Sequence, residues 1–165
     1  MLAGEPITGR EGLAGVSFKQ VDVSAKPMVL REAEAVGEIR LAPSTLDRIR
    51  KGKIEKGDPL SLGRLSGILA AKRTPEMLLL CHQLRLDSVE LVPSLTHSGV
   101  QVRSRVRARE RTGVEMEALA AVSVALLNIW DAVKQYEKDE GGQYPRTRIT
   151  GIRVTRKVKS PPATS

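Results

Sequence analysis

The chain has 165 residues, enough for one domain that buries about two-thirds of its unfolded surface. Hydrophobic residues form 41% of the chain but aromatic residues only 2%, so the core must be aliphatic and little is left for stacking against bases. A net charge of +8 attracts polyanions of any kind, and the single cysteine excludes an intramolecular disulfide, which favours a reducing cytosol.

The two ends of the chain have the composition of unstructured segments. Residues 1–20 hold four glycines and no periodic apolar pattern, so we predict a mobile arm there, and residues 160–165 (SPPATS) predict a disordered tail. The start of the chain lacks the basic and apolar stretches of a secretion signal, and the longest apolar run, residues 118–130, is too short to span a bilayer. The sequence therefore predicts a soluble, cytoplasmic protein with one domain over residues 21–159.

The first half of this domain predicts one strand and then a broken helical region. Residues 36–42 have strand composition, and residues 43–52 predict a short helix. Asp58 is an N-cap candidate followed by proline, so a second helix should begin there, with a further helical turn at residues 74–75. Apolar residues recur at helical spacing along the second helix, namely Leu62, Leu65, Ile68 and Leu69.

In the second half the apolar period falls to two and then returns to the helical value. Residues 89–95 and 100–112 predict a hairpin around a turn at residues 97–99. A helix with an apolar stripe should follow from Gly113 to residues 140–145, and residues 147–159 predict a last strand with a bulge at Gly151. The stripe consists of Met116, Leu119, Ser123, Leu126, Leu127, Trp130 and Val133. The order β-α-β-β-α-β predicts an α+β, ferredoxin-like fold: an antiparallel sheet with helices on one face.

One face of the return strand is formed by arginines between Arg103 and Arg111, and two interpretations stay open for it. The first is a solvated outer sheet face, or one paired with carboxylates of another subunit. The second is a nucleic-acid platform, but sheets that recognise bases carry aromatic residues that this one lacks. The second interpretation is therefore limited to contacts with a nucleic-acid backbone, without base stacking.

Several charged residues are candidates for proton transfer or phosphate binding. Asp131 and Lys134 are neighbours on one helix face, where a carboxylate and an amine can exchange protons with a substrate, although an ordinary surface ion pair has the same spacing. Glu115 and Glu117 stand at a helix start, where the helix dipole alone would favour them. Lys56 and Lys72 flank the second helix as candidate phosphate ligands, and no glycine-rich nucleotide motif occurs.

The only cysteine, Cys81, is followed directly by His82. Adjacent residues rarely chelate one metal ion or act on each other as nucleophile and base, and no second cluster completes a zinc site. Taken alone, Cys81 is best interpreted as a core residue and His82 as a satisfied polar residue. His97, in the predicted turn, is best interpreted as a surface residue.

Taken in order, six fragments resemble the cyclic pyranopterin monophosphate synthase family, MoaC, of molybdenum cofactor biosynthesis. The likeness covers roughly residues 20 to 140, and the fragments are VDVSAK (21–26), KGD (56–58), AAKRT (70–74), LCHQL (80–84), TGVEMEAL (112–119) and WDAVK (130–134). Each fragment is weak alone, but six in order at this spacing are specific. The resemblance implies the same ferredoxin-like fold that the period changes predict.

The resemblance also implies a lyase that converts (8S)-3′,8-cyclo-7,8-dihydroguanosine 5′-triphosphate to cyclic pyranopterin monophosphate and diphosphate. It makes Asp131, Lys134, Lys56 and Lys72 the catalytic candidates. It makes the following residues candidate substrate contacts: Lys26, Arg31, Leu80, Cys81, His82, Glu115, Met116 and Glu117. In that setting His82 becomes a site residue and Cys81 its scaffold, while Lys26 and Arg31 would come from a mobile N-terminal segment.

Further implications of the resemblance are a hexamer, a trimer of dimers, with sites at subunit contacts, and no membrane or nucleic-acid partner. No resident metal is implied, and Mg²⁺ accompanying the triphosphate stays open. The sequence departs from the family at Gln83, where proline is usual, in its longer arm, and in a C-terminus that lacks the Gly-Gly-Lys-Ser-Gly ending. The rival functions are a polyanion-binding module on the arginine strand and a non-catalytic homologue.

Overall fold

A computed structural model describes residues 17–161 and has the predicted order of strands and helices. Within the predicted arm and tail, residues 1–16 and 162–165 lie outside the described residues. The elements are β1 (Val29–Arg40), α1 (Pro43–Arg50), α2 (Pro59–Lys72), α3 (Thr74–Met77), β2 (Ser88–Leu95), β3 (Gly99–Glu110), α4 (Glu115–Val133), a 3-10 turn (Lys134–Tyr136) and β4 (Arg148–Lys159).

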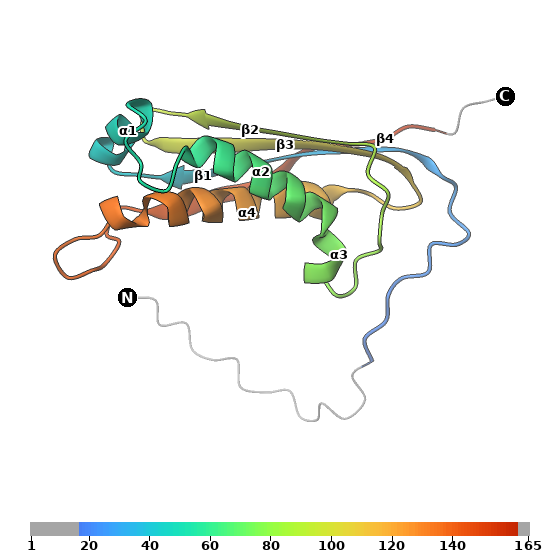
Figure 1. Cartoon of the computed structure of the whole chain (residues 1–165). Helices are drawn as coiled ribbons and strands as arrows, with labels where there is room; N and C mark the ends of the chain where they lie inside the picture. Colours follow the sequence, from blue (N-terminus) through green and yellow to red (C-terminus); the bar gives the residue numbers. More distant parts are fainter. Residues whose placement is uncertain (1–16, 162–165) are drawn as a thin grey trace.

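The four strands form one antiparallel sheet in the order β2-β3-β1-β4. Figure 1 shows α2 and α4 side by side on one face of this sheet, which confirms the ferredoxin-like α+β prediction. The predicted N-cap is confirmed as well, since the carboxylate of Asp58 accepts hydrogen bonds from the backbone of Leu60 and Ser61. The bulge is at the predicted place: Gly151 has φ +67°, and two residues of β4 face the single Gly37 of β1.

Strand β1 begins at Val29, seven residues before the strand start predicted at Val36. Its first half alternates alanine with glutamate, so it lacks the large apolar residues whose alternation predicts a strand. On the outer sheet face the side chain of Glu32 is only 7% exposed because three guanidinium groups surround it. Its carboxylate oxygens lie 2.7 Å from Arg105 Nη2, 3.4 Å from Arg107 Nε and 3.0 Å from Arg156 Nη1.

These contacts show what the arginine side chains of β3 face on the outer side of the sheet. The carboxylates that neutralise the centre of this strand come from β1 of the same chain, not from another subunit, because the register places Glu32 opposite Arg107 and Glu34 opposite Arg105. The hydrogen bond from Arg105 lowers the pKa of Glu32, so this carboxyl stays ionised at neutral pH. A backbone-binding platform would need these cations free.

Helices α2 and α4 approach closely because small residues line their contact. A Cβ atom on Gly67 would lie 2.7 Å from the carbonyl oxygen of Ala121, and one on Gly63 would lie 2.8 Å from the side chain of Ile129. Small side chains at a helix contact let the two backbones approach and leave the larger ones elsewhere. The buried face of α4 is accordingly rich in alanine: Ala118, Ala121, Ala125 and Ala132 are all at most 2% exposed.

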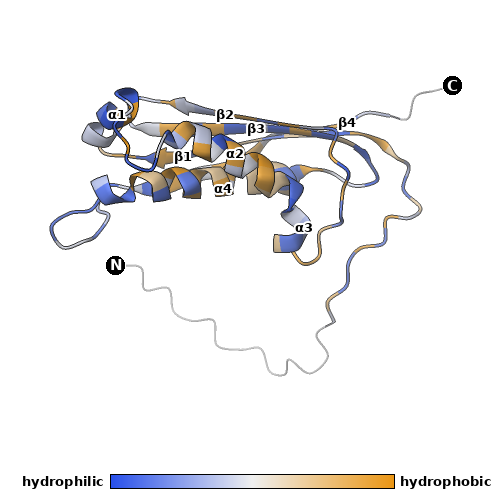
Figure 2. Ribbon diagram, viewed as in Figure 1, coloured by the Kyte–Doolittle hydropathy of each residue, from blue (hydrophilic) through white to orange (hydrophobic). Residues whose placement is uncertain are grey.

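Several large apolar residues of both helices nevertheless lie on the exposed side. Leu65 is 68% exposed and Leu127 is 55% exposed, although their spacing predicted the helices correctly. Figure 2 shows hydrophobic residues along both α2 and α4. The exposed apolar residues of this outer helical face are Leu62, Leu65, Leu69, Met116 and Leu127.

By length and composition alone, the segment Glu115–Tyr136 is apolar enough to cross a membrane. This segment is longer than the uninterrupted apolar run over residues 118–130, because it includes the charged residues near both ends of the helix. In the structure α4 packs against β1, β3 and α2, and Val122, Leu126 and Ile129 are fully buried there. This packing is that of the core helix of an α+β domain.

Candidate active site

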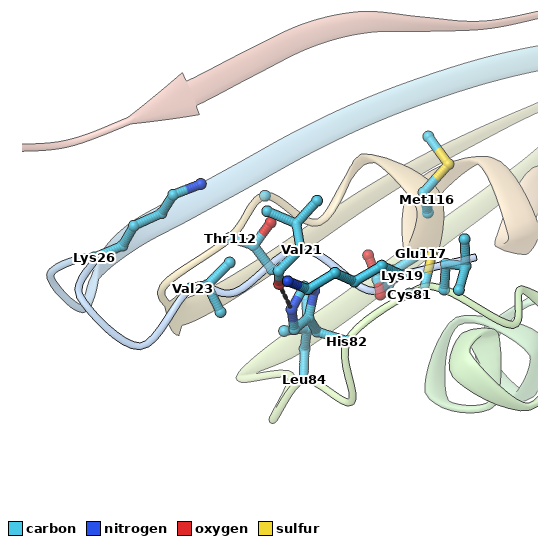
Figure 3. Close-up of a pocket in the computed structure, with 12 residues that line it drawn as sticks. Lys19, Val21, Val23, Lys26, Cys81, His82, Leu84, Thr112, Met116 and Glu117 are labelled. Atoms are coloured by element: carbon cyan, nitrogen blue, oxygen red, sulfur yellow. Dashed lines mark hydrogen bonds between the residues drawn. The ribbon is translucent and has the colours of Figure 1, made fainter. Parts of the chain in front are cut away.

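A hollow of about 390 Å³ lies beside the first turn of α4. Its walls come from residues 19–26 before β1, residues 80–84 after α3, the loop at residues 112–113 and the start of α4 (Figure 3). Segments far apart in the sequence thus meet at one place. Six of the predicted substrate contacts line the hollow: Lys26, Leu80, Cys81, His82, Met116 and Glu117.

His82 is held by the segment that precedes the first strand. Its Nε2 lies 2.7 Å from the carbonyl oxygen of Val21, drawn as a dashed line in Figure 3. Because a carbonyl oxygen only accepts, Nε2 must carry the hydrogen, and Nδ1 is the nitrogen left for another partner. The amide of Gln20 donates to the carbonyl oxygen of Cys81 at 2.9 Å, so two hydrogen bonds join residues 20–21 to residues 81–82.

The loop that presents these residues begins where α3 ends. The backbone N–H of Cys81 donates to the carbonyl of Leu78 at 2.9 Å, which closes a turn directly before His82. Thr74, which is fully buried, donates its hydroxyl to the carbonyl oxygens of Ala70 and Ala71 and anchors α3 to the end of α2. Gln83, which stands where the resemblance implies a proline, is exposed on the surface of this loop.

Glu117 forms a buried acidic wall of the hollow. The residue is 3% exposed, and its Oε2 has no hydrogen-bond partner in the described part of the chain. Burial raises the pKa of Glu117, with a smaller contribution from the charge of Glu115. Burial also raises the pKa of the Cys81 thiol, with the charge of Glu117 adding to the effect, so Cys81 rests as a neutral thiol rather than a nucleophilic thiolate.

Glu115, another predicted contact, forms an ion pair with Lys157 of β4. Sequence reasoning did not single out Lys157, because it is one of several cations in the last strand and no local signal distinguishes it. Lys157 lies opposite Ala33 in the sheet register, which brings the end of β4 to the start of α4. It joins the candidate residues near the hollow.

Two predicted residues take different places from those expected. Arg31 does not belong to a mobile segment: it lies in β1, is 8% exposed, and donates through Nη2 to the carbonyl oxygen of Arg111 at 3.0 Å. It therefore supports the loop that leads to Thr112. Lys72 ends α2 and lines a neighbouring hollow that shares Leu84 with the first, so it stands beside the His82 hollow rather than in it.

The other catalytic candidates meet at the opposite end of α4. Asp131 Oδ1 lies 2.7 Å from Lys134 Nζ, and Asp131 Oδ2 lies 2.6 Å from Lys56 Nζ. Hydrogen bonds from Lys134 and then from Lys56 lower the pKa of Asp131 to about 2, while Asp131 raises the pKa of Lys134. At neutral pH the cluster therefore holds one carboxylate between two ammonium groups.

Local geometry fixes this cluster from two directions. Gly57 follows Lys56 with φ +99°, a conformation that side chains disfavour, and it turns the chain into the N-cap of α2. Trp130 packs edge to face against Tyr144, with ring centroids 5.7 Å apart, which holds the following loop against the end of α4.

The two groups of candidates are separated by the helix that carries both. Glu117 and Asp131 are fourteen residues apart in α4, which at 1.5 Å per residue places them roughly 21 Å apart. Within one described chain, the His82 hollow and the Asp131 cluster are thus separate, and we refer to them as the two candidate half-sites. Residues 17–161 contain no cluster of three or more His, Cys, Asp or Glu side chains that could hold a metal ion.

Comparison with known proteins gives a consistent result. The MoaC family model matches residues 20–160. Proteins named "Probable cyclic pyranopterin monophosphate synthase" are similar over most of their length: the one from Saccharolobus solfataricus is 52% identical, covering 86% of this chain and 95% of its own. The relative from Sulfolobus acidocaldarius is 53% identical over 85% and 98% of the two chains, and that from Pyrococcus abyssi 50% identical over 86% and 89%.

Proposed function

The chain belongs to the MoaC family, and from this membership we propose that it is a lyase of molybdenum cofactor biosynthesis acting as a cyclic pyranopterin monophosphate synthase. It takes (8S)-3′,8-cyclo-7,8-dihydroguanosine 5′-triphosphate and yields cyclic pyranopterin monophosphate and diphosphate. The observation that carries the residue assignment is the meeting of six predicted substrate contacts in one hollow. Its single domain spans residues 21–159, and its place is the cytoplasm.

The chemistry needs repeated proton transfers while a guanine-derived ring opens and a pterin forms. Asp131 begins as a carboxylate between Lys56 and Lys134, so it starts as a base and the lysines start as acids. His82, whose Nε2–H is held by Val21, offers Nδ1 to the substrate. Closing the cyclic phosphate breaks the bond to the departing diphosphate, and cations such as Lys56, Lys72 and Lys26 stabilise the negative charge that develops there.

These roles require both half-sites to face one substrate, and a second subunit can supply the missing half. In a two-fold dimer whose α4 helices run antiparallel, the Asp131 end of one chain meets the His82 end of the other. The exposed apolar residues of the outer helical face support this contact, because burying leucines such as Leu65 and Leu127 releases them from water. We extend the proposal to a hexamer, a trimer of such dimers.

The arginine strand gives the rival polyanion-binding function little support, because Arg105, Arg107 and Arg156 are engaged by Glu32. The non-catalytic alternative has to explain why Asp131 stays in contact with both Lys56 and Lys134.

The test is an assay with the purified cyclised GTP intermediate, comparing the native chain with Asp131→Asn for diphosphate and pterin product. Product from the native chain alone is the expected result. Equal product from both would move the essential base to another residue. No product from the folded native chain with intact substrate would reject the synthase function. A matched control is Asp47→Asn, which also breaks an exposed lysine pair but stands on α1.

A further inference from the structure

We propose that the end of the sheet beyond the β2–β3 turn carries a separate binding site for a diphosphate group, distinct from both half-sites. A hollow of about 410 Å³ lies there, and four of its eight lining residues are arginines or histidine. Its cationic lining consists of Arg40 at the end of β1, His97 in the turn, and Arg146 and Arg148 at the start of β4. None of these four is a candidate residue of the proposed reaction.

The arrangement of two of these arginines opposes folding of the empty protein. Arg40 and Arg148 are direct partners in the register of β1 and β4, so their side chains project from the same face of the sheet. Like charges placed directly opposite on adjacent strands are destabilising. Elsewhere on the same face, Glu32 lies between Arg105, Arg107 and Arg156 and removes such repulsion.

At the hollow, no carboxylate of the described residues forms an ion pair with the arginines. Among residues 17–161, Arg40, Arg146 and Arg148 form no ion pair and no side-chain hydrogen bond. Glu38 lines an adjoining hollow with Arg40 and Arg148, but its carboxylate accepts from the amide of Gln101. Glu137 accepts from the backbone N–H of Ala42 and from Thr147.

The shape and charge of the hollow select the ligand class. Three guanidinium groups around one concavity match a compact, multiply charged anion, and each can donate two parallel hydrogen bonds to phosphate oxygens. A nucleic-acid backbone would need its cations spread along a track, as successive phosphates are. Leu41, Pro43 and Pro145 supply the apolar part of the lining. A diphosphate group can come from free pyrophosphate or from a nucleotide.

Calorimetric titration tests this site in the full chain. The parent carries Lys26→Gln, Lys56→Gln and Lys72→Gln, so that the lysines proposed to stabilise the departing diphosphate do not contribute, and the probes are inorganic pyrophosphate and ADP. Adding Arg146→Gln and Arg148→Gln should weaken pyrophosphate binding by about tenfold or more. The control Arg109→Gln removes an exposed cation from the other end of β3 and should change the affinity by less than about twofold. Tighter binding of ADP than of pyrophosphate would assign the diphosphate to a nucleotide.

The proposal is overturned if the parent binds neither probe, or if the Arg146→Gln, Arg148→Gln chain binds pyrophosphate as the parent does. Melting without ligand separates a binding role from a structural one. Removing a repelling pair should leave the melting temperature equal or raise it by about 1 to 3 °C. A clear fall would mean that the guanidinium groups are held by contacts in the assembled protein, such as a partner chain's carboxylates, and would also overturn the proposal.

Discussion

Chains that carry Asp131→Asn and chains that carry His82→Ala should restore each other's activity when they are assembled together. Each variant alone lacks one half of every site. Because roughly 21 Å of α4 separates the two halves in one chain, a working site in the proposed dimer joins the Asp131 end of one subunit to the His82 end of another. A mixed dimer then contains one site with both defects and one site with none.

The size of the recovery follows from this geometry. Equal amounts of the two variants, refolded together at random, give mixed dimers as half of all dimers, so about a quarter of all sites are intact in a two-fold assembly. The rate of diphosphate release per chain should therefore approach about a quarter of the native rate. Chains refolded separately and then mixed without exchange should keep only their own residual rates.

A converse mixture sharpens the test. Native chains assembled with an equal amount of chains that carry both substitutions should give about a quarter of the native sites, since each mixed dimer has one defect in each site. Sites contained within single chains would give about a half instead. Our reasoning is refuted if native mass spectrometry shows mixed dimers while the first mixture stays inactive and the second keeps half of its sites.

Three further outcomes follow from individual residues. Gly67→Val should lower the free energy of unfolding by about 3 kcal/mol or more in denaturant titration, because its Cβ would meet the carbonyl oxygen of Ala121; an unchanged midpoint would contradict that close approach. Glu117→Gln should abolish turnover yet stabilise the fold at pH 7 and not at pH 3. The pKa of Glu117 is raised in the folded protein, so its charged form destabilises the fold once the pH exceeds the pKa of the unfolded state. Equal stabilisation at both pH values would point to packing. Glu32 has a lowered pKa through Arg105, so its stabilisation is present above the unfolded pKa and is lost as the pH falls through the folded one; Glu32→Gln should flatten the acid limb of a melting-temperature profile, and a parallel profile would rule this out.

The order of strands and helices could be predicted because the apolar period changes cleanly at residues 89–95, 100–112 and 114 onwards. The early start of β1 could not, because Glu32 and Glu34 face guanidinium groups supplied by other strands, and only the sheet register brings them together. Local patterns likewise predicted α2 but not its orientation. Gly63 and Gly67 decide which side is buried, and a hydrophobicity pattern assigns glycine little weight.

The candidate site was predictable in its parts and only partly in its layout. Motif fragments predicted Cys81, His82 and Glu117 to contact one substrate, and the structure brings them to one hollow. They also grouped Asp131 with these residues, although its position fourteen residues beyond Glu117 on the predicted helix already implies a separation of roughly 21 Å. Lys157 was missed because its contact with Glu115 joins the last strand to a helix start.

The number of residues in α4 sets the distance between the His82 hollow and the Asp131 cluster. Each inserted residue would shift the Asp131 end by about 1.5 Å and rotate it by about 100°, so in the proposed dimer a single insertion would misplace the carboxylate relative to the hollow of the partner chain. Length variation among such chains should accordingly collect in surface segments such as residues 138–146, while the span from Glu115 to Val133 keeps a fixed number of residues.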